Sequence, residues 1–324
     1  MEPIILPRIS DKKPLVSVVS ITYNHESYIR DCLEGFLKQE TSFPLEIIIH
    51  DDASTDHTAD ILREYYEKRP DLFYLIIEKE NQYYRKDFLV PLFRQAQGKY
   101  VALCEGDDYW TDPLKLQKQF DFMESHSECS LCFHSVLQTT EGIKDRNRLK
   151  IPSGETSPKK IYPRWAIPTC SIFLKNKVIH EYAKILSKFK GFYSSDVVIF
   201  LSASNIGKLW GMEDTMAVYV RHSSGATQKI QEQSIFKHLR HHRAIRKAFP
   251  GLTKESYTYS VFLIYRFILK KKMLKLIKLL ACYKIRYHLR AYCFYAEELL
   301  LRSCINRQRV KNHGLLEKQL NKHT

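Results

Sequence analysis

A short acidic segment directly follows an apolar run in this chain. Glu105, Asp107 and Asp108 fall within four positions, and the residues 100–104, YVALC, precede them. An apolar run of this kind is typical of a buried strand. Carboxylates crowded at the end of such a strand repel one another unless a positive group lies among them. The sequence therefore raises the question of which cation these carboxylates hold.

The segments around the acidic residues alternate between strand and helix patterns. Apolar runs rich in β-branched residues predict strands over 16–22, 45–54, 71–78 and 99–105. Apolar residues at helical spacing predict helices over 28–37, 54–69 and 88–97. We expect Ser54 or Thr55 to cap the second of these helices. The alternation indicates an α/β protein with a mostly parallel central sheet and helices on both faces.

Polar side chains follow the end of every predicted strand. They are Thr22, Tyr23, Asn24 and His25 after the first, Asp51 and Asp52 after the second, Glu78 and Asn81 after the third, and Glu105, Asp107 and Asp108 after the fourth. In sheets of this class, ligands bind beyond the carboxyl ends of the strands. Asp51 and Asp56 are also typical of turns and helix caps, but that role does not explain the whole set. We expect a binding site at this edge.

The sequence contains no glycine-rich phosphate loop. Neither GxGxxG nor GxxxxGK[ST] occurs, which disfavours a dinucleotide fold and a P-loop. Carboxylates that hold a divalent cation neutralise phosphates in another way, because Mg²⁺ and Mn²⁺ take hard oxygen ligands and bridge to phosphate oxygens. The simplest cation for the acidic segment is thus Mn²⁺ or Mg²⁺ carrying a diphosphate.

Four segments in series resemble the bacterial family 2 glycosyltransferases. They are VSVVSITYNHESYIRDCLEGFLKQ, EIIIHDDASTDHT, GKYVALCEGDDYWTDPLKLQKQ and VYVRHSSGAT, which together span roughly residues 14–228. The resemblance implies a Rossmann-like glycosyltransferase A-type fold, a nucleotide-sugar donor, a divalent metal and inversion at the anomeric carbon. The family usually uses a uracil base, so a UDP-sugar is the expected donor.

The resemblance also assigns roles in the nucleotide-binding half. Thr22, Tyr23 and Asn24 match the loop that holds the base, and Asp52 matches the carboxylate that hydrogen-bonds the base ring. Asp107 and Asp108 match the acidic motif at the ribose and the metal. We expect Asp108 to be a metal ligand and Asp107 to be a ligand or a ribose contact. The motif departs from the common D-x-D-D pattern, because Glu105 stands first.

Two further residues are expected to act in the acceptor half. Asp196 matches the family's catalytic base, a carboxylate near the start of a helix; the alternative is a helix-capping role, because the helix dipole favours an acidic residue there. His222 follows the strand-like segment 216–220, and the resemblance implies contact with the metal or the diphosphate. The alternative for His222 is a loop histidine hydrogen-bonded to backbone.

The charge of the chain is concentrated in its last third. Residues 1–225 contain 29 Lys and Arg against 31 Asp and Glu, whereas residues 226–324 contain 22 against 5. We expect a catalytic domain over 1–228, with a nucleotide-binding half at 14–113 and an acceptor half at 114–228. A basic α-helical region follows at 229–324, with helices predicted over 236–249 and 266–302.

The basic region has the pattern of a segment that binds an anionic membrane surface, because Lys and Arg alternate with Leu, Ile and Tyr. A glycan or lipid-linked acceptor would fit such a location. Two alternatives are packing on the catalytic domain and pairing with another chain. Nucleic acid is disfavoured, because no recognition motif accompanies the charge.

Cellular location and rival functions follow from the rest of the sequence. The eight cysteines are scattered, which favours a reducing compartment. Residues 1–14 lack the apolar core of a signal peptide, and the apolar segment 259–269 is too short to span a bilayer. We therefore expect a cytoplasmic enzyme, peripheral on the inner face of the membrane, that builds a surface polysaccharide. The alternatives are a sugar nucleotidyltransferase and a non-catalytic membrane-associated scaffold.

Overall fold

The chain folds into two compact units, Met1–Gln233 and Ser234–Thr324. The computed structural model describes residues 2–82, 89–141, 143–149, 151–162, 167–223, 225, 234–271 and 286–291. The boundary predicted between residues 228 and 229 lies outside these ranges.

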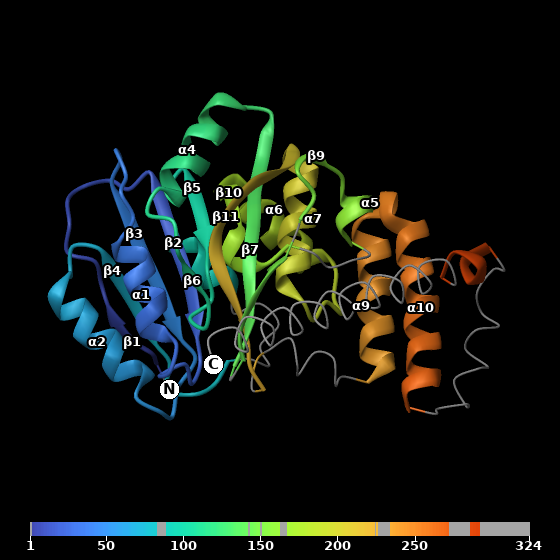
Figure 1. The fold of residues 1–324 in the computed structure, drawn as a ribbon, viewed down its shortest axis with the longest axis horizontal. Coiled ribbons are helices and arrows are strands. Elements are labelled where there is room, and N and C mark those ends of the chain that lie inside the picture. Colours follow the sequence, from blue (N-terminus) through green and yellow to red (C-terminus); the bar gives the residue numbers. More distant parts are fainter. Residues whose placement is uncertain are drawn as a thin grey trace, which may run out of the picture. The chain divides into compact units, whose positions relative to one another are not determined.

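An eleven-stranded sheet forms the centre of the first unit (Figure 1). Its main path runs β1-β4-β3-β2-β5-β10-β7-β11-β6, while β8 pairs with β7 and β9 pairs with β11. The strands are β1 (Ile4–Leu6), β2 (Val16–Thr22), β3 (Leu45–Asp51), β4 (Phe73–Ile77), β5 (Tyr100–Leu103), β6 (Tyr109–Trp110), β7 (Cys129–Thr140), β8 (Ile143–Leu149), β9 (Gly154–Thr156), β10 (Phe173–Lys175) and β11 (Lys208–Arg221).

The helices of the first unit connect these strands. They are α1 (Ile29–Leu37), α2 (Thr58–Lys68), α3 (Leu89–Arg94), α4 (Lys115–Ser125), α5 (Pro158–Ile161), α6 (Lys177–Lys188) and α7 (Ser195–Ile206). Strands β2, β3, β4 and β5 pair in parallel, as the sequence predicted, so their carboxyl ends meet at one edge. The α/β class with a mostly parallel central sheet is thereby confirmed.

Both faces of the parallel strands are buried. Alternate side chains along a strand point to opposite faces of the sheet, so the burial of neighbouring residues reports on both faces. Val18 and Ile47 share one apolar cluster with Leu33 of α1 and Leu62 of α2. The neighbouring Ile48 is equally inaccessible to solvent. Strands buried on both faces read as continuous apolar runs, which explains the pattern of segments 16–22 and 45–51.

Helix α2 begins four residues later than predicted, at Thr58 instead of Ser54. The hydroxyl of Ser54 donates to Asp51 Oδ1 at 2.5 Å, so this side chain is part of a turn and does not cap the helix. The N-cap residue is His57, whose side chain makes no capping hydrogen bond. Asp56, the residue before it, accepts the backbone N–H of Thr58 with its Oδ1 at 3.0 Å. An acidic side chain that accepts from the first turn is a common way to begin a helix.

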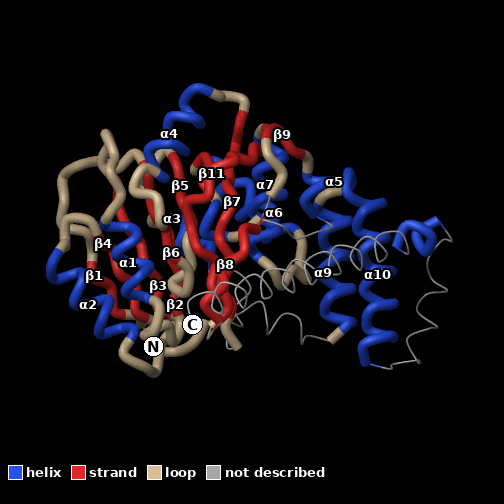
Figure 2. Tube along the Cα trace, in the orientation of Figure 1, coloured by secondary structure: helices blue, strands red, loops and turns tan. Residues whose placement is uncertain are grey.

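The second half of the sheet is built mainly from β7 and β11, which run in parallel side by side (Figure 2). The predicted strand 216–220 is the end of the longer β11. Segment 167–176 was predicted to be strand-like, but only Phe173–Lys175 forms a strand. A 3₁₀ turn, Thr169–Ser171, precedes it, and its carbonyl groups accept hydrogen bonds from side chains of other elements.

The second unit contains a pair of contacting helices, α9 (Ile235–Ala248) and α10 (Thr253–Lys271). The basic helix predicted over 236–249 is confirmed as α9, which Ser234 caps by accepting from the backbone N–H of Lys237. Ile235 shares an apolar cluster with Phe262 and Phe267 of α10. Most of the helix predicted over 266–302 lies outside the described residues. No helix within the described ranges is both long and apolar enough to cross a membrane.

Candidate active site

The acidic segment forms a tight loop between β5 and β6. The backbone N–H of Asp108 donates to the carbonyl of Glu105 at 3.0 Å, and the N–H of Gly106 donates to the carbonyl of Ile21 at 2.9 Å. A Cβ at position 106 would lie 2.9 Å from both Cβ and Oγ1 of Thr22. Glycine is thus required there, because it lets the loop lie directly against the end of β2.

Asp107 lies between two histidines from distant parts of the chain. Its Oδ2 is 2.9 Å from Nε2 of His222, which follows β11. The same oxygen is 3.8 Å from Nε2 of His25, which follows β2. Burial alone would raise the pKa of Asp107, but the hydrogen bond with His222 and the neighbouring imidazoles keep it below its usual value. Asp107 is therefore the most readily ionised carboxyl of the acidic segment.

The three carboxyl groups of the segment lie close enough to share one cation. Oxygen atoms of Glu105, Asp107 and Asp108 all lie within 4.8 Å of one another. Burial and the charges of Asp107 and Asp196 raise the pKa of Glu105 to about 8. Burial and the charges of Asp107 and Glu105 also raise the pKa of Asp108 well above its usual value. This repulsion would be relieved by a cation bound among them.

Asp108 also anchors the neighbouring strand. Its Oδ1 accepts the backbone N–H of Val220 in β11 at 2.8 Å, and the Cys170 thiol is hydrogen-bonded to its carboxyl group. Trp110 contacts the turn that carries Cys170, because its Nε1 donates to the Cys170 carbonyl at 2.9 Å. Lys115 is fully buried, with Nζ 4.0 Å from the centre of the Trp110 ring. Asp108 thus links the acidic segment to β11 and to the turn that carries Cys170.

Asp52 lies in a loop that is held by its neighbours. Its Oδ1 accepts the backbone N–H of Gln82 at 2.5 Å, and its own backbone N–H donates to the carbonyl of Thr22 at 2.9 Å. The side chain of Asn81 donates to the Asp52 carbonyl at 3.1 Å. Burial raises the pKa of Asp52 despite the Gln82 hydrogen bond. Asp52 and Thr22 therefore lie side by side at the ends of β3 and β2, the edge at which the sequence predicted a binding site.

Asn24 connects the loop after β2 to the loop after β3. It has φ 55°, a left-handed conformation that asparagine tolerates better than most residues. Its Oδ1 accepts the backbone N–H of Thr55 at 2.7 Å, and its own N–H donates to Oγ of Ser54 at 2.9 Å. Tyr23 lies next to it and is half-buried. The side chain of Asn24 thus positions the predicted base loop through its amide oxygen.

Asp196 lies in the first turn of α7, as predicted from the sequence. Ser194, the residue before the helix, donates its hydroxyl to Asp196 Oδ1. The charge of Asp196 contributes to the raised pKa of Glu105, so the two carboxyl groups are close enough for their charges to interact. The tertiary structure thus brings Asp196 within electrostatic reach of the acidic segment.

The site includes two side chains that were not among the predicted site residues. His25 was recognised only as one of the polar residues after the first strand. Tyr28 packs its ring 4.9 Å from the ring of His222, and its hydroxyl donates to Glu141 Oε1 at 2.7 Å. Burial and Glu141 raise the pKa of Tyr28 to about 12. The signal for both residues was the polar segment after β2. Their partners lie far away along the chain, because Asp107 is 82 positions from His25 and Glu141 is 113 positions from Tyr28.

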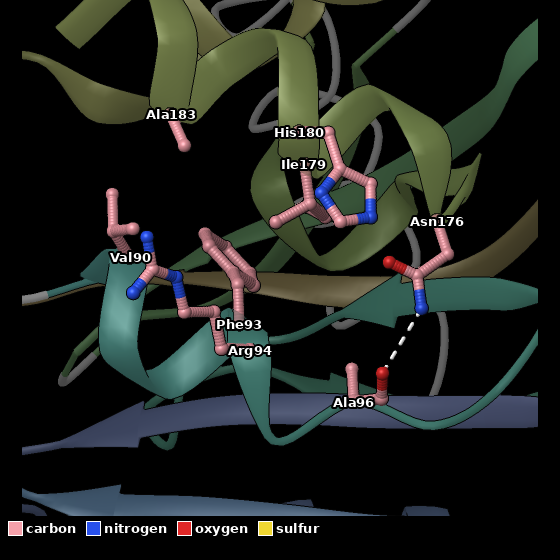
Figure 3. A pocket seen from close by; sticks show the side chains of 8 residues that line it. All are labelled: Val90, Phe93, Arg94, Ala96, Asn176, Ile179, His180 and Ala183. Atoms are coloured by element: carbon pink, nitrogen blue, oxygen red, sulfur yellow. Dashed lines mark hydrogen bonds between the residues drawn. The ribbon is translucent and has the colours of Figure 1, made fainter. Parts of the chain in front are cut away.

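A separate pocket lies between α3 and α6 (Figure 3). It has a volume of about 320 Å³, and its lining includes Phe93, Arg94, Ile179 and His180. None of the predicted site residues lines it. Asn176, at the start of α6, donates its backbone N–H to the carbonyl of Lys99, just before β5. The pocket is therefore at the opposite end of β5 from the acidic segment.

Several curated proteins are similar to this chain. An uncharacterized protein of Mycobacterium tuberculosis is 39% identical over 212 residues, which is 65% of this chain and 60% of that protein. TuaG of Bacillus subtilis, named for teichuronic acid biosynthesis as a glycosyltransferase, is 43% identical over 122 residues, which is 37% of this chain and 46% of TuaG. The chain thus spans about 60% of the mycobacterial relative and less of TuaG.

The fold and the sequence lead to the same family. The solved structure of Staphylococcus aureus TarS residues 1–349 with UDP-GlcNAc aligns with a TM-score of 0.59 at 17% identity, covering 78% of this chain and 72% of that chain. This likeness confirms the Rossmann-like glycosyltransferase A-type fold. The family model described as glycosyl transferase family 2 matches residues 17–182, which is half of the chain. The chain therefore belongs to glycosyl transferase family 2.

Proposed function

We propose that this chain is a glycosyltransferase that moves a sugar from a UDP-sugar to a glycan or lipid-linked acceptor, with inversion and with a divalent cation, in the synthesis of a bacterial surface polysaccharide. The gathering of Asp107 and His222 at the edge where Asp52 and Thr22 also lie, with Asp196 within electrostatic reach, carries the proposal. UDP-GlcNAc bound to TarS supports the donor class, and the name of TuaG supports the acceptor class.

The residues of the acidic segment fit a divalent cation. Oδ1 of Asp107 is buried and accepts no hydrogen bond from the described residues, so an acceptor atom remains for a ligand. Asp107, Asp108 and His222 would hold Mn²⁺ or Mg²⁺, which when bound offsets the negative charge of the departing diphosphate. In the same proposal Asp52, Thr22, Tyr23 and Asn24 form the base-binding loops, and Asp107 also faces the ribose.

The transfer needs one proton acceptor on the acceptor side of the sugar. In the proposed step, the acceptor oxygen forms a bond to the anomeric carbon while the bond from that carbon to the diphosphate oxygen breaks. The electron pair of the broken bond leaves with UDP, and the hydroxyl proton moves to the Asp196 carboxylate. Ser194 donates to Asp196 Oδ1, which helps to fix the orientation of the carboxylate.

A binding experiment tests this proposal directly. Thermal unfolding of the full chain is measured with UDP, GDP and ADP and with their sugars, each in Mn²⁺ and in EDTA. We expect the largest stabilisation from UDP compounds in Mn²⁺, because a ligand that binds the folded state raises its stability in proportion to the logarithm of its concentration over Kd. Equal stabilisation in Mn²⁺ and EDTA would contradict the metal, and a preference for GDP would contradict the uracil base.

We propose that residues 229–324 bring the enzyme to an anionic membrane surface on the cytoplasmic side. The charge asymmetry supports this, because 22 of the 51 Lys and Arg follow residue 225 against only 5 acidic residues. Part of the apolar pattern in this region has another cause, since Phe262, Ile264 and Phe267 are buried in the second unit. The proposed attraction therefore depends mainly on charge.

The full chain should co-sediment with vesicles that contain phosphatidylserine and not with neutral phosphatidylcholine vesicles. Raising the salt to 1 M should reverse this binding, because the Debye length falls to about 3 Å. Each Lys or Arg near the anionic surface contributes about 1 kcal/mol. Equal binding to both kinds of vesicle would indicate apolar insertion, and no binding to either would leave packing or chain pairing as the role of this region.

A further inference from the structure

His25 lies on the side of Asp107 next to the end of β2, and its position is fixed by the backbone. The N–H of His25 donates to Oγ1 of Thr58 at 2.9 Å, which joins it to the start of α2. A Cβ on Gly106 would lie 3.0 Å from Nδ1 of His25, so the imidazole packs directly against the loop of the acidic segment. The imidazole is thus held beside Asp107 from two directions.

His25, Asp107 and His222 form a cluster of two imidazoles and one carboxylate. Their potential ligand atoms all lie within 4.8 Å of one another. The two imidazole rings are nearly perpendicular, with centroids 6.0 Å apart, and Nε2 of each ring lies within 3.8 Å of Asp107 Oδ2. Ligand atoms on neighbouring corners of a metal with bonds of about 2.1 Å lie about 3 Å apart, so side-chain shifts of roughly 1 Å would complete the set.

We infer that His25 is a fourth protein ligand of the proposed cation, beside Asp107, Asp108 and His222. We also infer that two imidazoles make the site select first-row transition ions over Mg²⁺. The inference rests on the proposed metal site and goes beyond it by adding a ligand and a metal preference. Mg²⁺ keeps an oxygen shell and dehydrates reluctantly, whereas imidazole nitrogen favours transition ions. A site made only of Glu105, Asp107 and Asp108 would not discriminate in this way.

Metal binding to the full chain with UDP tests the inference. Mn²⁺ is titrated by the loss of its free electron paramagnetic resonance signal, Co²⁺ by its visible d–d absorption, and Mg²⁺ by competition with Mn²⁺. We expect affinity in the order Co²⁺ over Mn²⁺ over Mg²⁺. His25→Ala should weaken Co²⁺ and Mn²⁺ by about 10–100-fold and Mg²⁺ by less than about 3-fold. His57→Ala is the matched control, because the His57 side chain is 81% exposed at the start of α2.

His25→Gln separates ligation from positioning. The glutamine amide can donate a hydrogen bond to Asp107 but offers no nitrogen lone pair to a metal. A residue that only orients Asp107 would therefore be rescued for all three ions, whereas the loss of an imidazole ligand would weaken the preference for Co²⁺. Nitrogen couplings in the pulsed electron paramagnetic resonance of bound Mn²⁺ should indicate two imidazoles in the wild type and one in His25→Gln. Full rescue, or two couplings in the variant, would overturn the inference.

The failure of this inference differs from the failure of the metal proposal. If the wild type binds Mn²⁺ and His25→Ala binds it equally well, only the role of His25 is wrong. If the wild type binds none of the three ions with UDP present, the proposed metal site and the role of His25 are both wrong.

Discussion

Replacing Asp196 by asparagine should lower turnover by about 10²–10⁴-fold, the usual contribution of a positioned proton acceptor. Asparagine keeps the size of the side chain and can still accept the hydroxyl of Ser194, but it cannot take a proton from the acceptor. UDP affinity should stay within about 3-fold of the wild type, because the proposed role lies in the chemical step and leaves ground-state binding unchanged. Steady-state transfer and UDP titration measure the two quantities separately.

Asp60→Asn provides a matched control for this change. Asp60 lies in the first turn of α2 as Asp196 lies in the first turn of α7, so each substitution removes one charge that favours a helix start. That helix effect is worth about 0.3–1 kcal/mol of stability. We expect both variants to lose a similar amount of stability and only Asp196→Asn to lose turnover. Wild-type turnover in Asp196→Asn would reduce Asp196 to the helix-capping role.

Asp107→Asn should weaken UDP binding in Mn²⁺ by about 10²-fold, which is about 2.7 kcal/mol. The carboxylate is the member of the cluster nearest to both imidazoles, and its replacement by an amide removes a charged ligand from beside His222 and His25. In EDTA, wild type and variant should bind UDP with similar weak affinity, because the metal bridge is then absent from both. Isothermal titration with and without Mn²⁺ measures this difference.

Asp108→Asn tests whether the second carboxylate is a ligand or an anchor. The asparagine oxygen can still accept the N–H of Val220, so the hydrogen bond that holds β11 can persist. A ligand role predicts weaker UDP binding in Mn²⁺ and little change in EDTA.

Equal losses under both conditions for Asp107→Asn would contradict the metal role of the acidic segment, because damage to the fold does not depend on the ion.

The sequence alone determined the parallel part of the fold, from β2 to β5. The runs over 16–22 and 45–51 are continuous and β-branched because both of their faces are buried, and such runs signal parallel strands. The alternation of these strands with helices also predicted that the carboxyl ends of the strands share one edge of the sheet. Asp52 and Asp107 could therefore be placed at that edge before any contact was known, since strand ends in a parallel sheet coincide.

The sequence did not predict which polar side chains form the hydrogen bonds of the loop before α2. Ser54 has the residue type of a helix cap, yet its hydroxyl donates to Asp51 and the helix begins at Thr58. Several short polar side chains in one loop can satisfy the same backbone groups, so propensity does not choose among them. The tertiary contact between Asn24 and Thr55 helps to fix the choice.

Only the tertiary structure decided which side chains surround Asp107. His222 is 115 positions away along the chain, and its approach depends on the pairing of β11 with β7 and on the hydrogen bond from Val220 to Asp108. His25 is near β2 in sequence, but its approach to Asp107 depends on a glycine at position 106 that admits the loop. Sequence patterns report which face of an element is buried, whereas contacts between distant loops arise from packing, and the metal set proposed here is made of such contacts.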